Sequence, residues 1–247
     1  MRSSGLMRNL VLVLGLAVLP LATGCGSNPF NPPVDPGGGG LPADTPQNDT
    51  PQNTMIRFER TYENQVLDQY ELLFASNFRF TFSSQSDPGL VSQYGNNWGK
   101  DAEVTSTGNL FDGFTNDLGV SFAGASAITL SLDGASFIDD PTRPDSGAYY
   151  KYVIVPAINL SIEIPSLSGG DPTTFEISAP HDFYLVRGDV ALLDVTQEAT
   201  ASRWYIYRWD DKSPPLAVTP HLASLAPSAQ PVHTSWGNLK GSYAGAK

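Results

Sequence analysis

A change of apolar period within residues 64–112 constrains the fold of this chain most. Apolar side chains recur there first at helical spacing and then at every second position. The helical set is Val66, Leu67, Tyr70 and Leu73, and the alternating set is Phe78, Phe80 and Phe82. A helix that leads directly into an amphipathic strand predicts an α+β domain in which helices pack on a sheet. A further helix is expected to start at Trp98 and to end near Asp112, before Gly113.

The first 24 residues have the features of an export signal. Arg2 and Arg8 give it a positive start, and residues 10–22 form an apolar run that Pro20 interrupts. This run is shorter than a membrane-spanning helix requires. We therefore predict a signal peptide over residues 1–24, with a spanning anchor as the weaker alternative.

Cys25 is the only cysteine, so an intramolecular disulfide is impossible. The preceding residues, LATG at 21–24, resemble a bacterial lipobox, in which cleavage before the cysteine leaves a lipidated N-terminus. The usual motif has Leu three residues before the cysteine, where this chain has Ala22. The alternative is an ordinary secretory signal with an incidental cysteine. The resemblance implies a palmitate-bearing lipoprotein of the bacterial cell envelope, and Gly26 in place of Asp implies the outer membrane.

The charge balance argues against partners that carry many phosphates. Removal of residues 1–24 takes away two of the 14 basic residues and none of the 25 acidic ones, which changes the net charge from −11 to −13. Phosphate backbones repel such a protein, so we expect no nucleic-acid partner. We expect the protein to contact the lipid bilayer through the lipid attached to Cys25.

Proline and glycine divide the rest of the chain. Residues 25–49 contain NPPVDPGGGG and are predicted to be the lipidated cysteine and a flexible tether. The folded domain is expected over residues 50–211. Residues 212–247 are rich in Pro, Ser and Ala and are predicted to be a tail with a short terminal helix, because Trp236, Leu239 and Tyr243 have helical spacing.

A tandem repeat lies at the boundary between tether and domain. The sequence DTPQN occupies residues 44–48 and again residues 49–53. The second copy is expected to start a helix, with Thr50 as its cap and Pro51 in its first turn.

Long strands dominate the second half of the domain. Residues 150–162 alternate cleanly, which places every second residue from Tyr150 to Ile162 on one face. Pro156 in the middle of this strand predicts an edge position or a bulge. Residues 175–187 and 203–210 are expected to be the following strands.

This order of elements resembles the nuclear-transport-factor-2-like superfamily, which includes SnoaL-like and ketosteroid-isomerase-like proteins. The segments that carry the resemblance are residues 67–73 (LDQYELL), 78–80 (FRF), 98–99 (WG) and 204–210 (WYIYRWD). The chain looks most like uncharacterised bacterial lipoproteins of this fold. The resemblance implies a cone in which N-terminal helices pack inside a strongly bent antiparallel sheet, with a pocket at the open end.

Six residues are candidates for that pocket: Tyr70, Trp98, Tyr152, His181, Trp204 and Arg208. His181 and Asp182 are adjacent on a strand and therefore point to opposite faces, so they cannot form a dyad. An inward His181 would be a lone general base near Tyr152, although a structural or an exposed histidine is the better expectation. Arg208 is expected to pair with Asp210 or an inner carboxylate, or to stack on an aromatic ring.

The sequence contains few other signs of chemistry. Isomerase-like members carry an acid directly after the first strand, and Asp87-Pro88 matches that position only loosely because it lies further along the chain. The three histidines lack the spacing of metal ligands, and no phosphate loop, dinucleotide motif or nucleophile elbow is present. We therefore expect no metal and no cofactor, and the catalytic residues stay unknown.

Three functions remain open at this point. The first is a membrane-anchored domain that binds a ligand, such as a small apolar molecule, or a protein partner. The second is a SnoaL-like enzyme of the proton-transfer type. The third is a scaffold in which one face of the sheet forms a homodimer.

Overall fold

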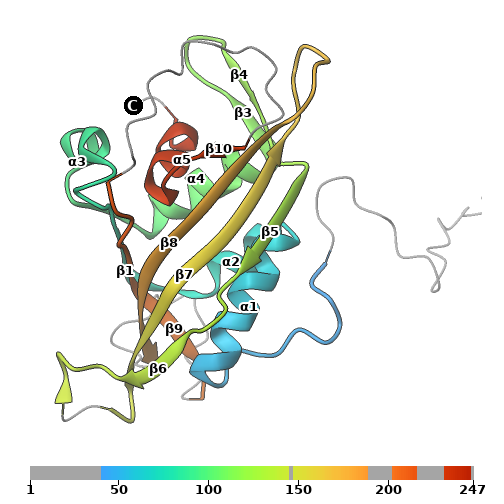
Figure 1. Cartoon of the computed structure of the whole chain (residues 1–247). Coiled ribbons are helices and arrows are strands. Elements are labelled where there is room, and N and C mark those ends of the chain that lie inside the picture. The colour runs from blue at the N-terminus through green and yellow to red at the C-terminus, as the bar shows by residue number, and fades with distance from the viewer. Residues whose placement is uncertain (1–39, 145–146, 189–201, 216–230, 246–247) are drawn as a thin grey trace, which may run out of the picture. The chain divides into compact units, whose positions relative to one another are not determined.

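The computed structural model describes residues 40–144, 147–188, 202–215 and 231–245 (Figure 1). The predicted signal peptide, Cys25 and its lipid, and the tether as far as residue 39 lie outside the described residues. Within the described ranges, no helix is long and apolar enough to cross a membrane.

The described residues form the predicted α+β fold, with helices packed in a curled sheet. The helices are α1 (Pro51–Glu63), α2 (Leu67–Glu71), α3 (Pro88–Tyr94), α4 (Lys100–Asp112) and α5 (Trp236–Tyr243). The strands are β1 (Phe74–Thr81), β2 (Asn97–Gly99), β3 (Gly113–Thr115), β4 (Ser121–Ala123), β5 (Ala127–Ser131), β6 (Ser136–Asp139), β7 (Tyr150–Ile164), β8 (Thr173–Arg187), β9 (Trp204–Asp211) and β10 (Val232–His233).

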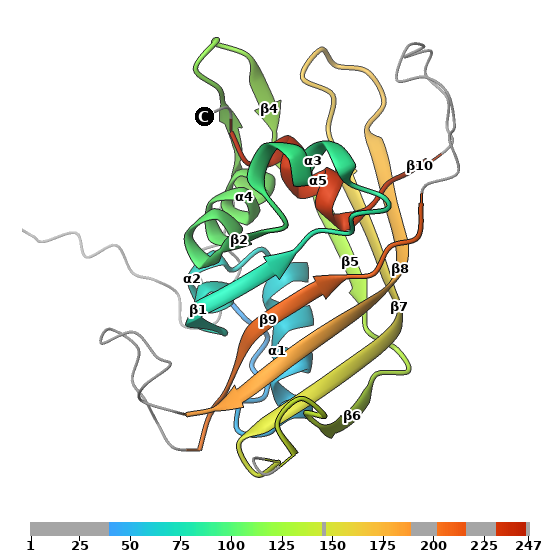
Figure 2. The ribbon, with the colours of Figure 1, turned by 90° about the vertical axis from the view of Figure 1, so that its left-hand side faces the viewer.

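The main sheet has the strand order β2-β1-β9-β8-β7-β5, with β6 beside β7 and β10 beside β8. Most pairs are antiparallel, but β1 runs parallel to β9 and β10 runs parallel to β8. Figure 2 shows β1, β9, β8 and β7 in front, with α1 behind them against the inner face of the sheet. Strands β1 and β9, which are far apart in the sequence, therefore lie side by side in the main sheet.

Helix α1 has the structure that its sequence predicts. The Thr50 side chain accepts a hydrogen bond from the backbone N–H of Asn53, and Pro51 occupies the first turn. Its apolar face contributes Met55, Phe58 and Tyr62 to the core. The Phe58 ring meets the rings of Phe183 on β8 and Trp209 on β9 edge-on, so α1 is packed directly on the inner face of the sheet.

Strand β7 confirms the bulge expected at Pro156 but not the predicted face. The register with β8 shifts between Val155 and Ile158, and β7 lies between β8 and β5 rather than at an edge. The extra residue turns the alternation over, because side chains in a strand alternate with period two. Val153 and Val155 are therefore buried, while Tyr152 is only partly buried. The prediction of one common face was wrong for the first half of the strand.

Two expectations near Trp98 also change. Trp98 lies in the short strand β2, opposite Phe80 of β1, and helix α4 begins only at Lys100. Its end at Asp112 is confirmed, with Gly113 at a φ of 77°. Residues 83–97 are polar, and the sequence predicts a long loop there, but the structure has α3 (Pro88–Tyr94) in this stretch, between β1 and β2.

Helix α5 completes the core, and the helical spacing predicted for Trp236, Leu239 and Tyr243 is confirmed. The Ser235 side chain caps the helix by accepting a hydrogen bond from the backbone N–H of Asn238. All three of the spaced residues are buried. Trp236 packs against Trp209 with 4.7 Å between the ring centroids, so the tail reaches the inner face of the sheet.

Candidate functional site

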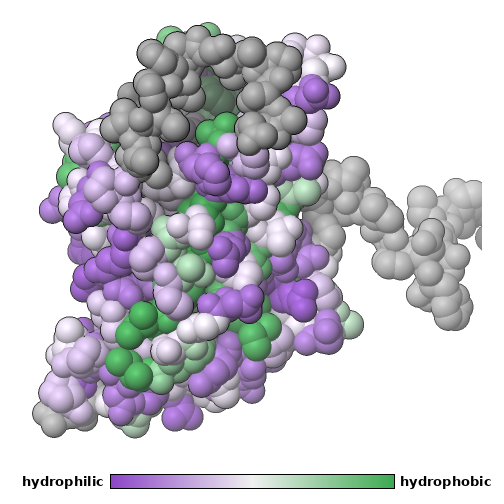
Figure 3. All heavy atoms as spheres, in the orientation of Figure 1, coloured by the Kyte–Doolittle hydropathy of each residue, from purple (hydrophilic) through white to green (hydrophobic). Residues whose placement is uncertain are grey.

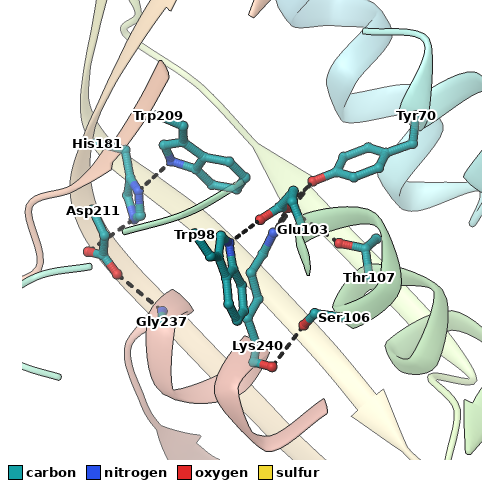
Figure 4. A network of polar contacts seen from close by, with 10 residues as sticks. All are labelled: Tyr70, Trp98, Glu103, Ser106, Thr107, His181, Trp209, Asp211, Gly237 and Lys240. Carbon is teal, nitrogen blue, oxygen red and sulfur yellow. Dashed lines mark hydrogen bonds and ion pairs between the residues drawn. The ribbon is translucent and has the colours of Figure 1, made fainter. Parts of the chain in front are cut away.

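Helices α4 and α5 meet at a buried ion pair between Glu103 and Lys240, which we call the Glu103–Lys240 centre. Both side chains are 0 % exposed. Glu103 also accepts hydrogen bonds from Tyr70 Oη at 2.6 Å and from Trp98 Nε1 at 3.1 Å. Thr107, one turn further along α4, donates a longer bond of 3.4 Å. Figure 4 shows these groups converging on the carboxylate from α2, β2, α4 and α5.

Four aromatic rings surround the ammonium group of Lys240. Its Nζ lies 4.5 Å from the ring centroid of Trp209, 5.4 Å from Phe80, 5.5 Å from Trp236 and 6.0 Å from Tyr70. Distances within about 6 Å allow a cation–π attraction, which is stronger in a dry environment. We call Glu103 and these rings the ammonium cage.

Burial lowers the pKa of Lys240 well below its usual range, because an ammonium ion loses its water there. The neighbouring Glu103 carboxylate is the charge that opposes this desolvation. Burial likewise raises the pKa of Tyr70, whose hydroxyl therefore stays a donor to Glu103.

A second polar group, the His181 cluster, lies beside the first and contains His181, Trp209, Asp211, Asp87 and Ser235. Trp209 Nε1 donates to His181 Nδ1 at 2.9 Å. Because an indole nitrogen only donates, the neutral imidazole has its proton on Nε2, which lies 3.8 Å from Asp211 Oδ1. Burial lowers the pKa of His181, which is 0 % exposed. His181 is thus a neutral side chain of the core.

Two buried carboxylates of this cluster hold the N-terminus of α5. Ser235 donates a short hydrogen bond to Asp87, and the backbone N–H of Gly237 donates to Asp211 Oδ2 at 3.2 Å. The position suits negative groups because the first turn of a helix has unpaired N–H groups. Burial raises the pKa of Asp87 to about 6.

The structure separates the six pocket candidates. Tyr70 and Trp98 come together on Glu103, and His181 lies in the neighbouring cluster. Tyr152 and Arg208 lie on the outer face, where both contact Tyr184. The Tyr152 ring stacks on that ring at 4.8 Å, and the Arg208 guanidinium lies 4.6 Å from its centroid. His181 faces the core, so it is not the general base near Tyr152 that its sequence position allows.

Arg208 does both things expected of it. Besides stacking on Tyr184, it donates to both carboxylate oxygens of Asp210, at 2.8 and 2.6 Å.

On the side of the domain drawn in Figure 3, hydrophobic residues form small groups between hydrophilic ones. Trp204 is buried at the start of β9, where its backbone exchanges two hydrogen bonds with Asn48.

An open hollow lies between residues 40–47 and the helices α1 and α2. It encloses about 390 Å³ and contains none of the six candidates. Its lining residues are Gly40, Leu41, Pro42, Ala43, Thr45, Gln47, Arg57, Val66, Asp68 and Gln69. Arg57, its basic residue, donates to Pro46 O at 3.0 Å and to Gln69 Oε1 at 2.6 Å, so its guanidinium is already engaged.

Sequence reasoning missed Glu103, Lys240 and Asp211 as interior groups. Glu103 shares a helix face with Thr107 and Leu110, and Lys240 shares one with Trp236 and Tyr243. A charged residue on each of two apolar helix faces is a signal for a buried pair. In the described part of the chain, no group of three or more His, Cys, Asp or Glu residues could hold a metal ion.

No protein-family model and no curated protein matches the chain. Solved structures do match it. One is a nuclear transport factor 2 (NTF2-like) superfamily protein from Salmonella enterica, with 9% identity and a TM-score of 0.38, covering 71% of this chain and 92% of that one. Another is an NTF2-like protein of unknown function in nutrient uptake from Rhodospirillum rubrum, with 12% identity and a TM-score of 0.34, covering 66% and 93%.

A third is a protein described as a SnoaL-like polyketide cyclase from Shewanella denitrificans. It is 9% identical, with a TM-score of 0.34, and the match covers 65% of this chain and 87% of that one. The solved structures to which this chain is similar thus include proteins described as NTF2-like and as SnoaL-like.

Proposed function

We propose that this chain is a lipoprotein of the bacterial envelope whose folded domain binds a ligand. The anchor part of the proposal rests on LATGC at residues 21–25 and on the apolar run before it. The binding part rests on one observation, the ammonium cage, in which Glu103 and four rings enclose a charged group. Such cages are a recurring means of recognising cations.

Catalysis by proton transfer has less support from the same groups. Asp87, Glu103, His181 and Asp211 are each at most 3 % exposed. A general acid or base must come within hydrogen-bond reach of the substrate's proton. Glu103 instead accepts from Tyr70 and Trp98, and His181 Nδ1 accepts from Trp209. Glu103 and His181 thus already accept hydrogen bonds at the atoms that a general base would use.

Metabolic labelling tests the anchor. Cells that express the full chain are grown with an alkyne-tagged palmitate, and their inner and outer membranes are separated. We expect label on the wild-type protein in the outer membrane and none on the Cys25→Ser variant. Label on that variant, or an unlabelled wild-type protein, would contradict the lipoprotein assignment.

Native mass spectrometry tests the binding domain. The full chain is purified in a mild detergent from the cells that make it, with no ligand added. A retained small-molecule mass that disappears on denaturation supports binding. A dimer without ligand would favour the scaffold alternative, and turnover of the retained molecule would favour the enzyme.

A further inference from the structure

Every part of the ammonium cage except Trp236 belongs to the domain before its tail. Glu103 lies on α4, and its donors Tyr70 and Trp98 lie on α2 and β2. Phe80 and Trp209 come from the paired strands β1 and β9. The carboxylate has three donors from these elements, so its position does not depend on Lys240 alone. The cage is therefore a preorganised receptor for a cation.

Lys240 occupies this receptor as a ligand would. Its ammonium group forms an ion pair with Glu103 and lies over the Trp209 ring, while the backbone carbonyl of the same residue accepts from Ser106 Oγ at 2.8 Å. Figure 4 shows the side chain extending from α5 toward the carboxylate. A buried ion pair usually adds less stability than apolar residues of the same volume would. The arrangement thus suits recognition of a charge better than simple core packing.

Helix α5 is short and depends on its neighbours for its structure. It has eight residues, two of which are glycines, and helices this short are not stable alone in water. It forms no strand pairing, and side chains of neighbouring elements supply the bonds to its backbone, such as Asn109 Nδ2 to Tyr243 O at 2.8 Å. Its helical structure therefore depends on docking.

We propose that the ammonium cage is a binding site for a primary alkylammonium ion, that Lys240 is its internal ligand, and that the external ion binds when α5 undocks. This inference rests on the proposed binding function and names its ligand class. The exchange is a competition between two ammonium groups for Glu103 and the rings of Phe80 and Trp209.

Chemical complementation tests the receptor. Lys240→Ala in the full chain removes three methylene groups and the ammonium, a group that n-propylammonium reproduces. We expect the variant to have a lower Tm, and n-propylammonium to raise that Tm saturably. 1-Propanol, which has a similar size but no charge, should have no comparable effect. In the Lys240→Ala/Glu103→Gln background we expect amine binding weaker by about tenfold or more.

Two outcomes of that titration would overturn the proposal. Equal binding of 1-propanol and n-propylammonium would show only a cavity, and unchanged amine binding after Glu103→Gln would exclude the carboxylate as the recognition group. Neither outcome would alter the retention of a ligand in native mass spectrometry. The ammonium proposal and the binding function can therefore fail separately.

Hydrogen exchange of the wild-type chain tests the displacement. We expect n-propylammonium, and not 1-propanol, to accelerate exchange of the α5 amides. Lys240→Met keeps the volume of the side chain and removes its charge. This variant replaces Lys240→Ala in the test if Lys240→Ala does not fold. In that variant we expect the same acceleration at about tenfold lower amine concentration. If n-propylammonium leaves hydrogen exchange of the α5 amides unchanged in both proteins, the proposed displacement of Lys240 by an external ion is overturned.

Discussion

Two copies of one pentapeptide show how strongly a residue's role depends on its neighbours. In the copy at residues 44–48, Asn48 is 5 % exposed and donates to Trp204 O at 2.8 Å, and its own carbonyl accepts from Trp204 N at 2.7 Å. In the copy at residues 49–53, Asn53 is near the surface and its side chain donates to Asp49. The same five residues thus bond to β9 in the first copy and begin helix α1 in the second.

We predict a clear difference between Asn48→Ala and Asn53→Ala. Loss of the buried Asn48 hydrogen bond should lower the free energy of unfolding by about 1–3 kcal/mol. The Asn53 side chain, which is only partly buried, should matter by about 0.5 kcal/mol or less. Urea unfolding of both variants measures this, with Asn53→Ala as the matched control from the repeat. Equal losses would contradict the fastening role of Asn48.

Asp87 makes the folding stability of the domain depend on pH. Its pKa is raised to about 6, mainly by burial, from an ordinary value of 3.8. Between these two pKa values the folded state keeps the proton of Asp87 and the unfolded state loses it. The stability that the protonated Asp87 contributes is therefore full below pH 4 and is lost as the pH rises through 6. His181 acts in the opposite direction, because burial lowers its pKa and its contribution is lost as the pH falls below 6.5.

We therefore predict that Asp87→Asn gains stability relative to the wild type between pH 5 and pH 7. Asparagine resembles the protonated acid and needs no ionisation, while the His181 contribution is common to both proteins and cancels. Urea midpoints of the two proteins at both pH values give the comparison. A stability difference that does not change with pH would contradict the burial of Asp87.

Helix α5 approaches its neighbours closely at two glycines. A Cβ added at Gly237 would lie 2.2 Å from Asp87 Oδ2, in the contact that holds the helix start. One added at Gly241 would lie 2.5 and 2.8 Å from the two methyl groups of Leu90, which form the flexible end of a half-buried side chain. The first neighbour is fixed by Ser235, and the second is able to rotate.

We expect Gly237→Ala to destabilise the protein by about 1–3 kcal/mol through overpacking. Gly241→Ala should be neutral or stabilising by up to about 1 kcal/mol, because alanine favours the helix. Thermal unfolding and hydrogen exchange of the α5 amides would show the difference. If Gly241→Ala proved the more harmful change, the fit of α5 against α3 would differ from the one described.

At the scale of the whole molecule, the parts predicted from sequence are those governed by local pattern. Helix α1, its Thr50 cap and the end of α4 at Gly113 follow from spacing and capping chemistry. The face of β7 does not, because the bulge near Pro156 reverses the alternation and sequence does not state which side gains the extra residue. Of the six candidates named from the sequence, Tyr70, Trp98 and His181 lie in the interior beside the Glu103–Lys240 centre.

Glu103 and Lys240 were missed because their partnership is a long-range one, between residues 137 positions apart. Each appears alone as an ordinary charged residue on a helix. Only the docking of α5 beside α4 makes the two charges compatible with burial. The signal available in the sequence was a charge on an apolar helix face, and it requires a second such helix to be interpreted.

The ion pair between Glu103 and Lys240 joins α5 to the rest of the domain. A double-mutant cycle with Glu103→Gln, Lys240→Met and the double variant, measured by urea unfolding, tests it directly. We predict that each single change costs about 3 kcal/mol or more, because it leaves one buried charge uncompensated, and that the double change costs far less than the sum. Strictly additive losses would show that the two side chains do not interact, and would contradict the account.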